Sequence, residues 1–129
     1  LDLGFELEAV TVEADGFLLR EALGNLLHNA VQYVPRGGRV TVRTGAAGVE
    51  RRPFLEVEDD GPGIPEAERT RVVERFYRVP GTTGTGSGLG LAIVREIAAS
   101  HGAALSIGDG AGGRGCRVRI LFEADKANG

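Results

Sequence analysis

The sequence predicts an α+β fold, a two-layer α/β sandwich whose mixed, mostly antiparallel sheet carries its helices on one face. Two observations lead to this prediction. Segments in which apolar and polar residues alternate, as in strands, are interleaved with segments in which apolar residues recur every three or four positions, as in helices. Most of the alternating segments also lie in neighbouring pairs separated by glycine-containing turns, which is typical of antiparallel strands.

Each element follows from its local pattern. Asp15 is a suitable N-cap for a long helix, whose apolar residues share one face as far as Val34. A half-buried strand is expected before it, over residues 4–13, with apolar side chains at Phe5, Leu7 and Ala9. Further strands are expected at 39–44, 54–59, 103–108 and 116–122, a short helix at 65–77, a longer helix at 89–101, and a frayed tail at about 123–129.

Length and composition indicate a single domain over residues 1–129, because 129 residues of which 42% are hydrophobic can bury a sizeable core. The net charge of −3 provides no broad basic surface, which argues against nucleic acid as a partner. The single cysteine, Cys116, excludes an internal disulfide and a multi-cysteine zinc site, and we expect it to be a buried strand residue. The sequence has no apolar run near the roughly 20 residues of a membrane helix, and since it lacks methionine we expect a piece of a longer protein.

The first candidate site is a polar row on the long helix. Asn25, Asn29 and Tyr33 are spaced four residues apart, so at about 100° per residue they lie along one side of the apolar stripe. Asparagine has a low preference for the middle of a helix. The row indicates either a polar site at the helix edge or amides that face solvent or pack between helices. His28 falls opposite the stripe, where we expect a surface residue.

The second candidate site is the stretch "VEDDGPGIP" at 57–65, which directly follows a predicted strand. It can be a simple turn, because Gly-Pro-Gly ends a strand and an aspartate caps local amides. It can also be a binding site, since Asp59 would place an acceptor beside backbone that lacks Cβ atoms at Gly61 and Gly63. A flat heterocycle with an exocyclic amine would fit there, with the amine donating to Asp59.

The third candidate site is the glycine-rich loop that leads into the helix at 89–101. A Walker phosphate loop is excluded, because the only lysine is Lys126 in the tail. A dinucleotide fingerprint is excluded as well, since Leu89 and Leu91 stand where its third glycine would be. The remaining interpretation is a helix N-terminus near Gly88 and Gly90 that offers free N–H groups to an anion, with the glycines also serving as hinges of a lid.

Taken together, these motifs resemble the catalytic ATP-binding domain of bacterial sensor histidine kinases. "NLLHNA" at 25–30 resembles the N box of that family, "DDGPGIP" at 59–65 its first glycine box, "ERFYR" at 74–78 its F box, and "GSGLGLAIVREIAASHG" at 86–102 its second glycine box. The resemblance covers about residues 5–122 and keeps the family's order of boxes. It implies the Bergerat fold of the GHKL group with a flexible ATP lid, and the binding of ATP and Mg²⁺.

The resemblance also implies roles for individual residues. Asn29 would bind Mg²⁺ through its amide oxygen, and Asn25 would support the phosphates or the metal. Asp59 would accept from the adenine amine, and Tyr33 would lie along the ring. The other implied contacts are Gly61, Gly63 and Ile64 around the ring, Arg75 and Arg78 at the triphosphate or the incoming histidine, and Gly86, Gly88, Leu89 and Gly90 in the lid and phosphate cradle.

The implied activity is that of a protein-histidine kinase, with Asn25, Asn29 and Arg78 as catalytic residues. The γ-phosphoryl of Mg-ATP would pass to a histidine on the dimerisation and phospho-acceptor hairpin of the same parent protein, with a response regulator downstream. The chain lacks that acceptor, because neither His28 nor His101 is followed by an acidic residue. We expect a monomer located in the cytoplasm, with its parent protein anchored in the inner membrane.

Two alternative functions stay open. The related gyrase, heat-shock chaperone and mismatch-repair ATPases activate water with a glutamate one turn before the metal-binding asparagine, where this chain has Asn25. An amide cannot act as that base, which favours phosphoryl transfer over hydrolysis. The other alternative is a nucleotide-binding interaction module without kinase activity, or a related anti-sigma-factor serine kinase. The family often has lysine where Gln32 stands, which leaves the nucleotide affinity open.

Overall fold

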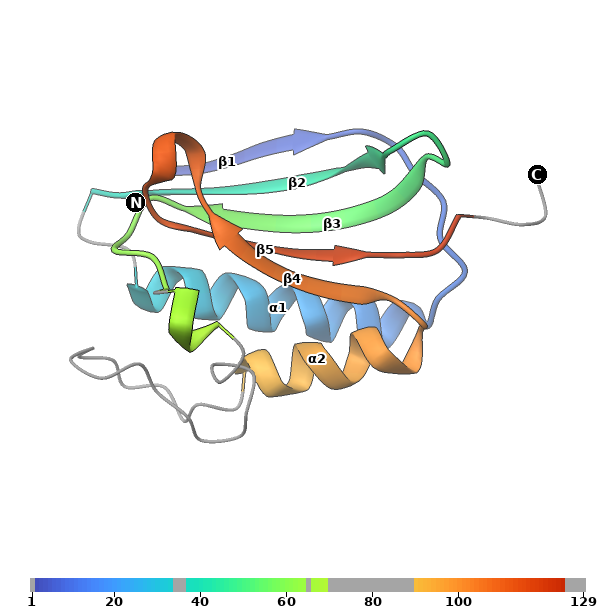
Figure 1. Cartoon of the computed structure of the whole chain (residues 1–129). Helices are drawn as coiled ribbons and strands as arrows, with labels where there is room; N and C mark the ends of the chain where they lie inside the picture. The colour runs from blue at the N-terminus through green and yellow to red at the C-terminus, as the bar shows by residue number, and fades with distance from the viewer. Residues whose placement is uncertain (1, 34–36, 65, 70–89, 125–129) are drawn as a thin grey trace.

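The computed structural model describes residues 2–33, 37–64, 66–69 and 90–124 and has two layers, a five-stranded sheet and a pair of α-helices on one of its faces (Figure 1). The elements are β1 (Asp2–Leu7), α1 (Gly16–Tyr33), β2 (Arg39–Ala47), β3 (Arg52–Asp59), the 3₁₀ turn η1 (Glu66–Glu68), α2 (Gly90–Ser100), β4 (Ala104–Asp109), the 3₁₀ turn η2 (Ala111–Gly113) and β5 (Cys116–Leu121). Neither α1 nor α2 combines the length and the apolar character that a membrane-spanning helix needs, and this holds for the described residues.

The sheet is mixed and mostly antiparallel, as predicted. Its strand order is β1-β2-β3-β5-β4. β1 pairs with β2 in parallel, and the other three pairs are antiparallel. The central register places Val57 of β3 opposite Val42 on one side and Val118 on the other, so the three valines share one face of the sheet.

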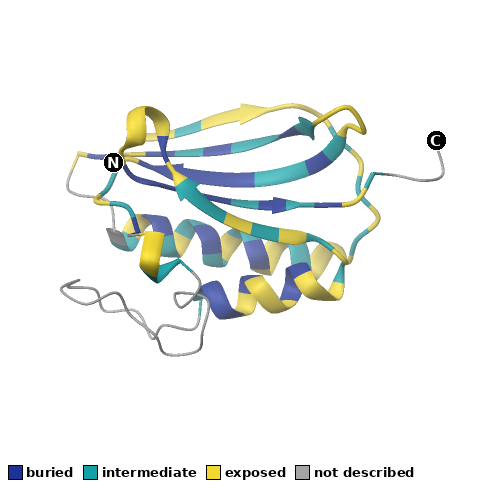
Figure 2. Cartoon of the chain, in the orientation of Figure 1, coloured by how far each residue is buried: buried dark blue, intermediate teal, exposed yellow. Residues whose placement is uncertain are grey.

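The core lies between this valine-rich face and the two helices (Figure 2). α1 contributes Ala22, Leu26 and Ala30, which recur at helical spacing and are all buried. α2 contributes the buried side chains of Leu91, Val94, Ile97 and Ala98. The opposite face of the sheet carries charged residues instead, so one layer of helices is enough to cover the apolar side.

The start of α1 is tied to the end of α2. The Asp15 carboxylate oxygen Oδ1 accepts the N–H groups of Phe17 and Leu18 at 2.9 and 3.1 Å, which confirms Asp15 as the N-cap. The Asp15 N–H donates to Nε2 of His101 at 3.1 Å, so Nδ1 of that ring carries the proton and donates to the Ile97 carbonyl at 2.8 Å. His101 follows directly after α2, as expected for a helix-end residue.

The first strand differs from its prediction. β1 ends at Leu7 instead of residue 13, and Phe5 and Leu7 are 60% and 64% exposed instead of half-buried. Ala9 is exposed too. The alternation did identify the correct face, since Phe5 pairs with the buried Val42. β1 is an edge strand, however, and the helices pack mainly under the strands beyond it, so no helix covers this part of the apolar face among the described residues.

The short helix predicted at 65–77 is described only in part. The turn η1 covers Glu66–Glu68, and Arg69 follows it. Residues 70–89 lie outside the described residues, as does the tail from 125 onward.

Candidate functional site

Three segments with candidate site residues meet at one end of the sandwich, on the left in Figure 1: the C-terminal half of α1, the end of β3 with the turn after it, and the start of α2. α1 runs toward this end and α2 runs away from it. A Cβ atom built on Gly90 would lie 3.6 Å from the Asn25 amide oxygen, so the start of α2 closely approaches the polar row of α1. The fold thus brings the described parts of the three candidate sites to one end of the sandwich.

Asp59 is the last residue of β3 and the most deeply buried candidate, with 6% of its surface exposed. Its carboxylate accepts the N–H of Gly61 at 2.9 Å and also the backbone N–H of Cys116 on β5. Burial raises the pKa of Asp59 above its ordinary value, and these two hydrogen bonds offset the rise only in part. A buried acceptor held by backbone donors is a preorganised partner for a ligand that donates a hydrogen bond.

The neighbouring Asp60 has a different role. It is exposed, and its Oδ1 accepts the N–H of Arg39 at the start of β2 at 2.8 Å. The Asp60 N–H returns a bond to the Arg39 carbonyl at 3.2 Å. Asp59 is therefore the candidate site residue, whereas Asp60 stabilises the contact between the end of β3 and the start of β2.

Asn25 and Asn29 of α1 are both half-buried, and Asn25 faces the start of α2. Asn25 Nδ2 donates to the Glu21 carbonyl one turn back at 2.8 Å, which directs its oxygen toward Gly90. Among the described residues, the Asn29 amide has no hydrogen-bond partner. Tyr33 is the last residue of α1, and its side chain lies outside the description.

The turn after Asp59 is held in place by contacts of Ile64 and of Gly63. Ile64 is buried in the core. Its carbonyl accepts Arg69 Nε at 3.0 Å, and Arg69 Nη2 also pairs with Asp109 at the end of β4 at 2.6 Å. Gly63 has φ +79°, a conformation that favours glycine, and a Cβ atom there would lie 2.7 Å from the Gly115 carbonyl oxygen. The absence of a side chain at Gly63 is thus required by packing, whatever the ligand.

Gly115 makes the tightest approach to the site. A Cβ atom built on it would lie 1.8 Å from the Asp59 carbonyl oxygen, and its φ is +77°. We expect Gly115→Ala to reduce the free energy of unfolding by about 2–4 kcal/mol, the sum of left-handed strain and overpacking. Gly112→Ala is the matched control, because Gly112 also has positive φ (+68°) but no atom within 4 Å of its Cβ position. Urea denaturation measures both, and an equal loss in the two variants would contradict the contact argument.

Cys116 is buried beside Asp59, as the strand pattern predicted. Burial and, secondarily, the Asp59 charge raise the pKa of its thiol to about 12, so it is an inert, protonated group. His28 is exposed on α1, in agreement with the sequence. Of the other predicted site residues, Gly61, Gly63, Ile64 and Gly90 lie at this end of the fold, whereas Arg75, Arg78, Gly86, Gly88 and Leu89 lie outside the described residues.

The sequence analysis did not identify the residues that hold Asp59 and its turn in position. Arg69, Gly115 and the Cys116 N–H act on Asp59 or on its turn, but no motif identified them. The local signal is the glycine-rich stretch "DGAGGRG" at 109–115, one of the glycine-containing turns that separate neighbouring strands.

The arrangement provides two complementary features for one elongated ligand. Asp59 offers a buried hydrogen-bond acceptor, and the start of α2 presents the positive end of a helix dipole, which favours an anion. An acceptor for an amine at one end and an anion site at the other define a nucleotide-binding domain of the two-layer sandwich type.

Comparison with known proteins identifies the family. The model of the family described as "Histidine kinase-, DNA gyrase B-, and HSP90-like ATPase" matches residues 14–126. Because this match covers most of the chain, the chain belongs to that family of ATP-binding domains.

The similar proteins are sensor kinases. The swarming motility regulation sensor protein RssA of Serratia marcescens is 44% identical over 84% of this chain, and the sensor protein kinase PmrB of Pseudomonas aeruginosa is 39% identical over 95%. The chain spans only 23% and 25% of those two proteins. Among solved structures, the mycobacterial sensor histidine kinase MprB is 36% identical with a TM-score of 0.86, covering 95% of this chain and 82% of that one. The catalytic domain of histidine kinase ThkA is 25% identical with a TM-score of 0.79, covering 95% and 78%. These likenesses confirm the predicted α+β sandwich of a histidine kinase catalytic domain.

Proposed function

We propose that this chain binds Mg-ATP and transfers the γ-phosphoryl group to a histidine on a separate phospho-acceptor hairpin of its parent protein. The observation that carries the proposal is the buried Asp59 carboxylate, which lies on the helix side of the sheet at the end of the fold where α1 ends and α2 begins, in a domain whose relatives are named sensor kinases. ATP is the ligand expected of the family.

The adenine end of the nucleotide is assigned to Asp59 and its turn. The exocyclic amine of adenine donates to the carboxylate, which the N–H groups of Gly61 and Cys116 hold in place. Gly61 and Gly63 border the ring, Ile64 provides an apolar contact from the core, and Tyr33 lies along the ring. A guanine base carries a carbonyl at the position of that amine, so Asp59 selects against it.

The phosphate end is assigned to the start of α2 and to Mg²⁺. The residues present suit this ion, because the Asn29 amide oxygen is a hard ligand that Mg²⁺ accepts together with phosphate oxygens, and it has no hydrogen-bond partner in the part of the chain that the structure describes. The described residues hold no cluster of three or more His, Cys, Asp or Glu side chains that could bind a metal alone. The ion would neutralise phosphate charge, and Asn25, Gly86, Gly88, Leu89 and Gly90 are proposed to cradle the phosphates, with Arg75 and Arg78 as their cationic partners.

The proposed reaction is an in-line displacement. A ring nitrogen of the acceptor histidine forms a bond to the γ-phosphorus while the bond between that phosphorus and the β–γ bridging oxygen breaks, and ADP leaves. The domain contributes positioning and electrostatic stabilisation rather than covalent chemistry. Asn25 supports transfer over hydrolysis, because its amide donates to the Glu21 carbonyl and cannot take a proton from water.

Asn29→Ala tests the assignment of the metal. We expect phosphorylation of a supplied phospho-acceptor hairpin to fall at least about 100-fold, because the variant lacks the proposed protein ligand for Mg²⁺. Binding of ADP without Mg²⁺ is expected to stay within about twofold, since Asp59 is unchanged. His28→Ala, an exposed neighbour on α1, is the control. Unchanged transfer by Asn29→Ala would remove Asn29 from the metal site.

The wider setting follows from the same proposal. The parent protein is proposed to be anchored in the inner membrane with this domain on the cytoplasmic side, to pass its phosphoryl group to a response regulator, and to dimerise through the hairpin while this domain is monomeric. Wild-type protein that binds ATP but never phosphorylates any supplied hairpin would favour the non-catalytic nucleotide-binding module instead.

A further inference from the structure

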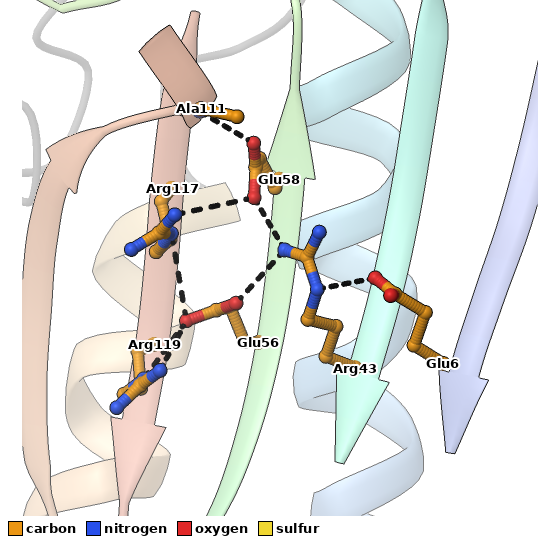
Figure 3. A network of polar contacts seen from close by, with 7 residues as sticks. All are labelled: Glu6, Arg43, Glu56, Glu58, Ala111, Arg117 and Arg119. Atoms are coloured by element: carbon orange, nitrogen blue, oxygen red, sulfur yellow. Dashed lines mark hydrogen bonds and ion pairs between the residues drawn. The ribbon is translucent and has the colours of Figure 1, made fainter. Parts of the chain in front are cut away.

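The end of β3 is covered, on the face away from the helices, by the β4–β5 connection at residues 110–115 (Figure 3). Glu58 points to this face, whereas Asp59, the next residue along the strand, points to the helix side. The Glu58 carboxylate therefore contacts the connection itself, and the Asp59 carboxylate contacts Cys116, the residue directly after it, from the opposite face of the sheet.

Glu58 holds the beginning of the connection. Its Oε2 accepts the N–H of Ala111, the first residue of η2, at 2.7 Å. Its Oε1 pairs with Arg43 and lies 3.5 Å from Nη2 of Arg117. Only 8% of Glu58 is exposed. Burial raises the pKa of this carboxyl, but the Ala111 N–H and the Arg43 charge outweigh that effect, so the pKa of Glu58 lies below its ordinary value and the acceptor is ionised at neutral pH.

The end of the connection holds Asp59. Gly115 packs directly on the Asp59 carbonyl, and the N–H of Cys116 donates to the Asp59 carboxylate. Gly110 lies between the Asp59 backbone and the Glu58 carboxylate, because its Cβ position is 3.1 Å from the Asp59 carbonyl oxygen and 3.3 Å from Glu58 Oε2. Only four residues separate Ala111 from Cys116, so a displacement of the backbone at Ala111 is expected to change the position of the N–H group that donates to the Asp59 carboxylate.

The connection has little stiffness of its own. Four of its six residues, 110, 112, 113 and 115, are glycine. Its internal backbone bonds are three and none is short: the Gly113 N–H donates to the Gly110 carbonyl at 3.1 Å, the Arg114 N–H to the Ala111 carbonyl at 3.3 Å, and the Gly110 N–H to the Gly115 carbonyl at 3.4 Å. Because glycine-rich backbone has a large conformational freedom to lose, an external anchor is needed to keep it in one place.

We propose that Glu58 is a positioning residue of the nucleotide site: by fixing Ala111 it holds Gly115 and Cys116 where they orient Asp59 toward adenine. Glu58 touches no nucleotide itself. This inference rests on the proposed function, because it takes Asp59 as the adenine acceptor.

The test is calorimetric titration of ADP into the 129-residue chain and its Glu58→Ala variant. We expect the variant to bind at least about tenfold more weakly, since Asp59 loses its fixed orientation. Glu58→Gln is expected to bind within about threefold of wild type, because its amide oxygen still accepts the Ala111 N–H. In ¹H–¹⁵N spectra, the amide signals of Cys116 and Gly61 are expected to shift in Glu58→Ala and to return toward their wild-type positions in Glu58→Gln.

Glu56→Ala separates positioning from general destabilisation. Glu56 also pairs with Arg43, but it contacts no backbone group of the connection among the described residues. We expect this variant to be less stable and yet to bind ADP within about twofold of wild type at a temperature where it is folded. Equal affinity of Glu58→Ala and wild type, or an equal loss of affinity in Glu56→Ala and Glu58→Ala, would overturn the positioning role. Wild-type protein that binds no ADP would instead overturn the proposed function.

Discussion

Replacing Asp59 by asparagine is expected to reduce ADP affinity at least about 100-fold while changing the free energy of unfolding by no more than about 1 kcal/mol at neutral pH. The variant loses the ionised acceptor for the adenine amine, and its single acceptor oxygen must serve both Gly61 and Cys116. Relief from burying a carboxylate offsets part of that mismatch. Calorimetry with ADP and urea denaturation measure the two quantities separately.

The pH dependence gives a second, independent signature of Asp59. Its pKa is raised in the folded chain above the ordinary value of 3.8, so its contribution to stability is fully present below pH 3.8 and is lost as the pH rises through the folded pKa. The stability of Asp59→Asn relative to wild type should therefore increase as the pH rises from acidic values toward neutral. ADP binding by wild type should weaken as the pH falls through the same folded pKa, because a protonated Asp59 no longer accepts from an amine.

Asp60→Asn is the matched control for both experiments. Asp60 is adjacent and acidic, but it is exposed and bonds only Arg39 among the described residues. We expect its ADP affinity to stay within about twofold of wild type. Equal affinity of the Asp59→Asn variant and wild type would show that Asp59 does not bind the base.

Glu56→Ala is expected to reduce the free energy of unfolding by about 3 kcal/mol. Glu56 is 1% exposed and lies between Arg43 at 3.1 Å and Arg119 at 2.8 Å, which come from the strands on either side. Its removal leaves these guanidinium groups without a central carboxylate. The loss is at the lower end of the range for broken buried pairs because both arginine side chains keep 29% exposure and can be partly hydrated.

Glu6→Ala is the comparison for this experiment, since Glu6 pairs with the same Arg43 but has a side chain that is 63% exposed. Exposed pairs contribute little, so we expect a change within about 0.5 kcal/mol. Urea denaturation at neutral pH measures both variants. Similar losses in the two would mean that burial does not decide the strength of these ion pairs.

Much of the fold could be predicted from the sequence because its signals are local. Asp15 caps α1 through bonds to residues two and three positions away, and the strands β2, β3 and β5 alternate clearly between core and charge. Phe5 shows the limit of such signals. Alternation gives the face on which a side chain lies, but whether a helix covers that face is decided by packing across the whole sheet.

The candidate site also contains residues that local sequence signals identified and residues that they did not. Asp59 and the asparagines were identified because glycines and mid-helix amides are unusual locally. The residues that hold Asp59 were not, since their contacts join distant segments: Arg69 reaches Asp109 across 40 positions, and Ala111 reaches Glu58 across 53. Only the folded sheet brings such pairs together, and neither partner is unusual in its own stretch of sequence.

The charged face of the sheet also has a consequence for how the domain meets other surfaces. Glu6, Glu56 and Glu58 and the arginines at 43, 117 and 119 already neutralise one another across four strands (Figure 3). A second sheet stacked on this face would have to dehydrate the partly exposed arginines and Glu6 without supplying new partners for them. The face thus remains wet and resists the face-to-face sheet association from which aggregates grow, even though its strands are rich in valine and isoleucine.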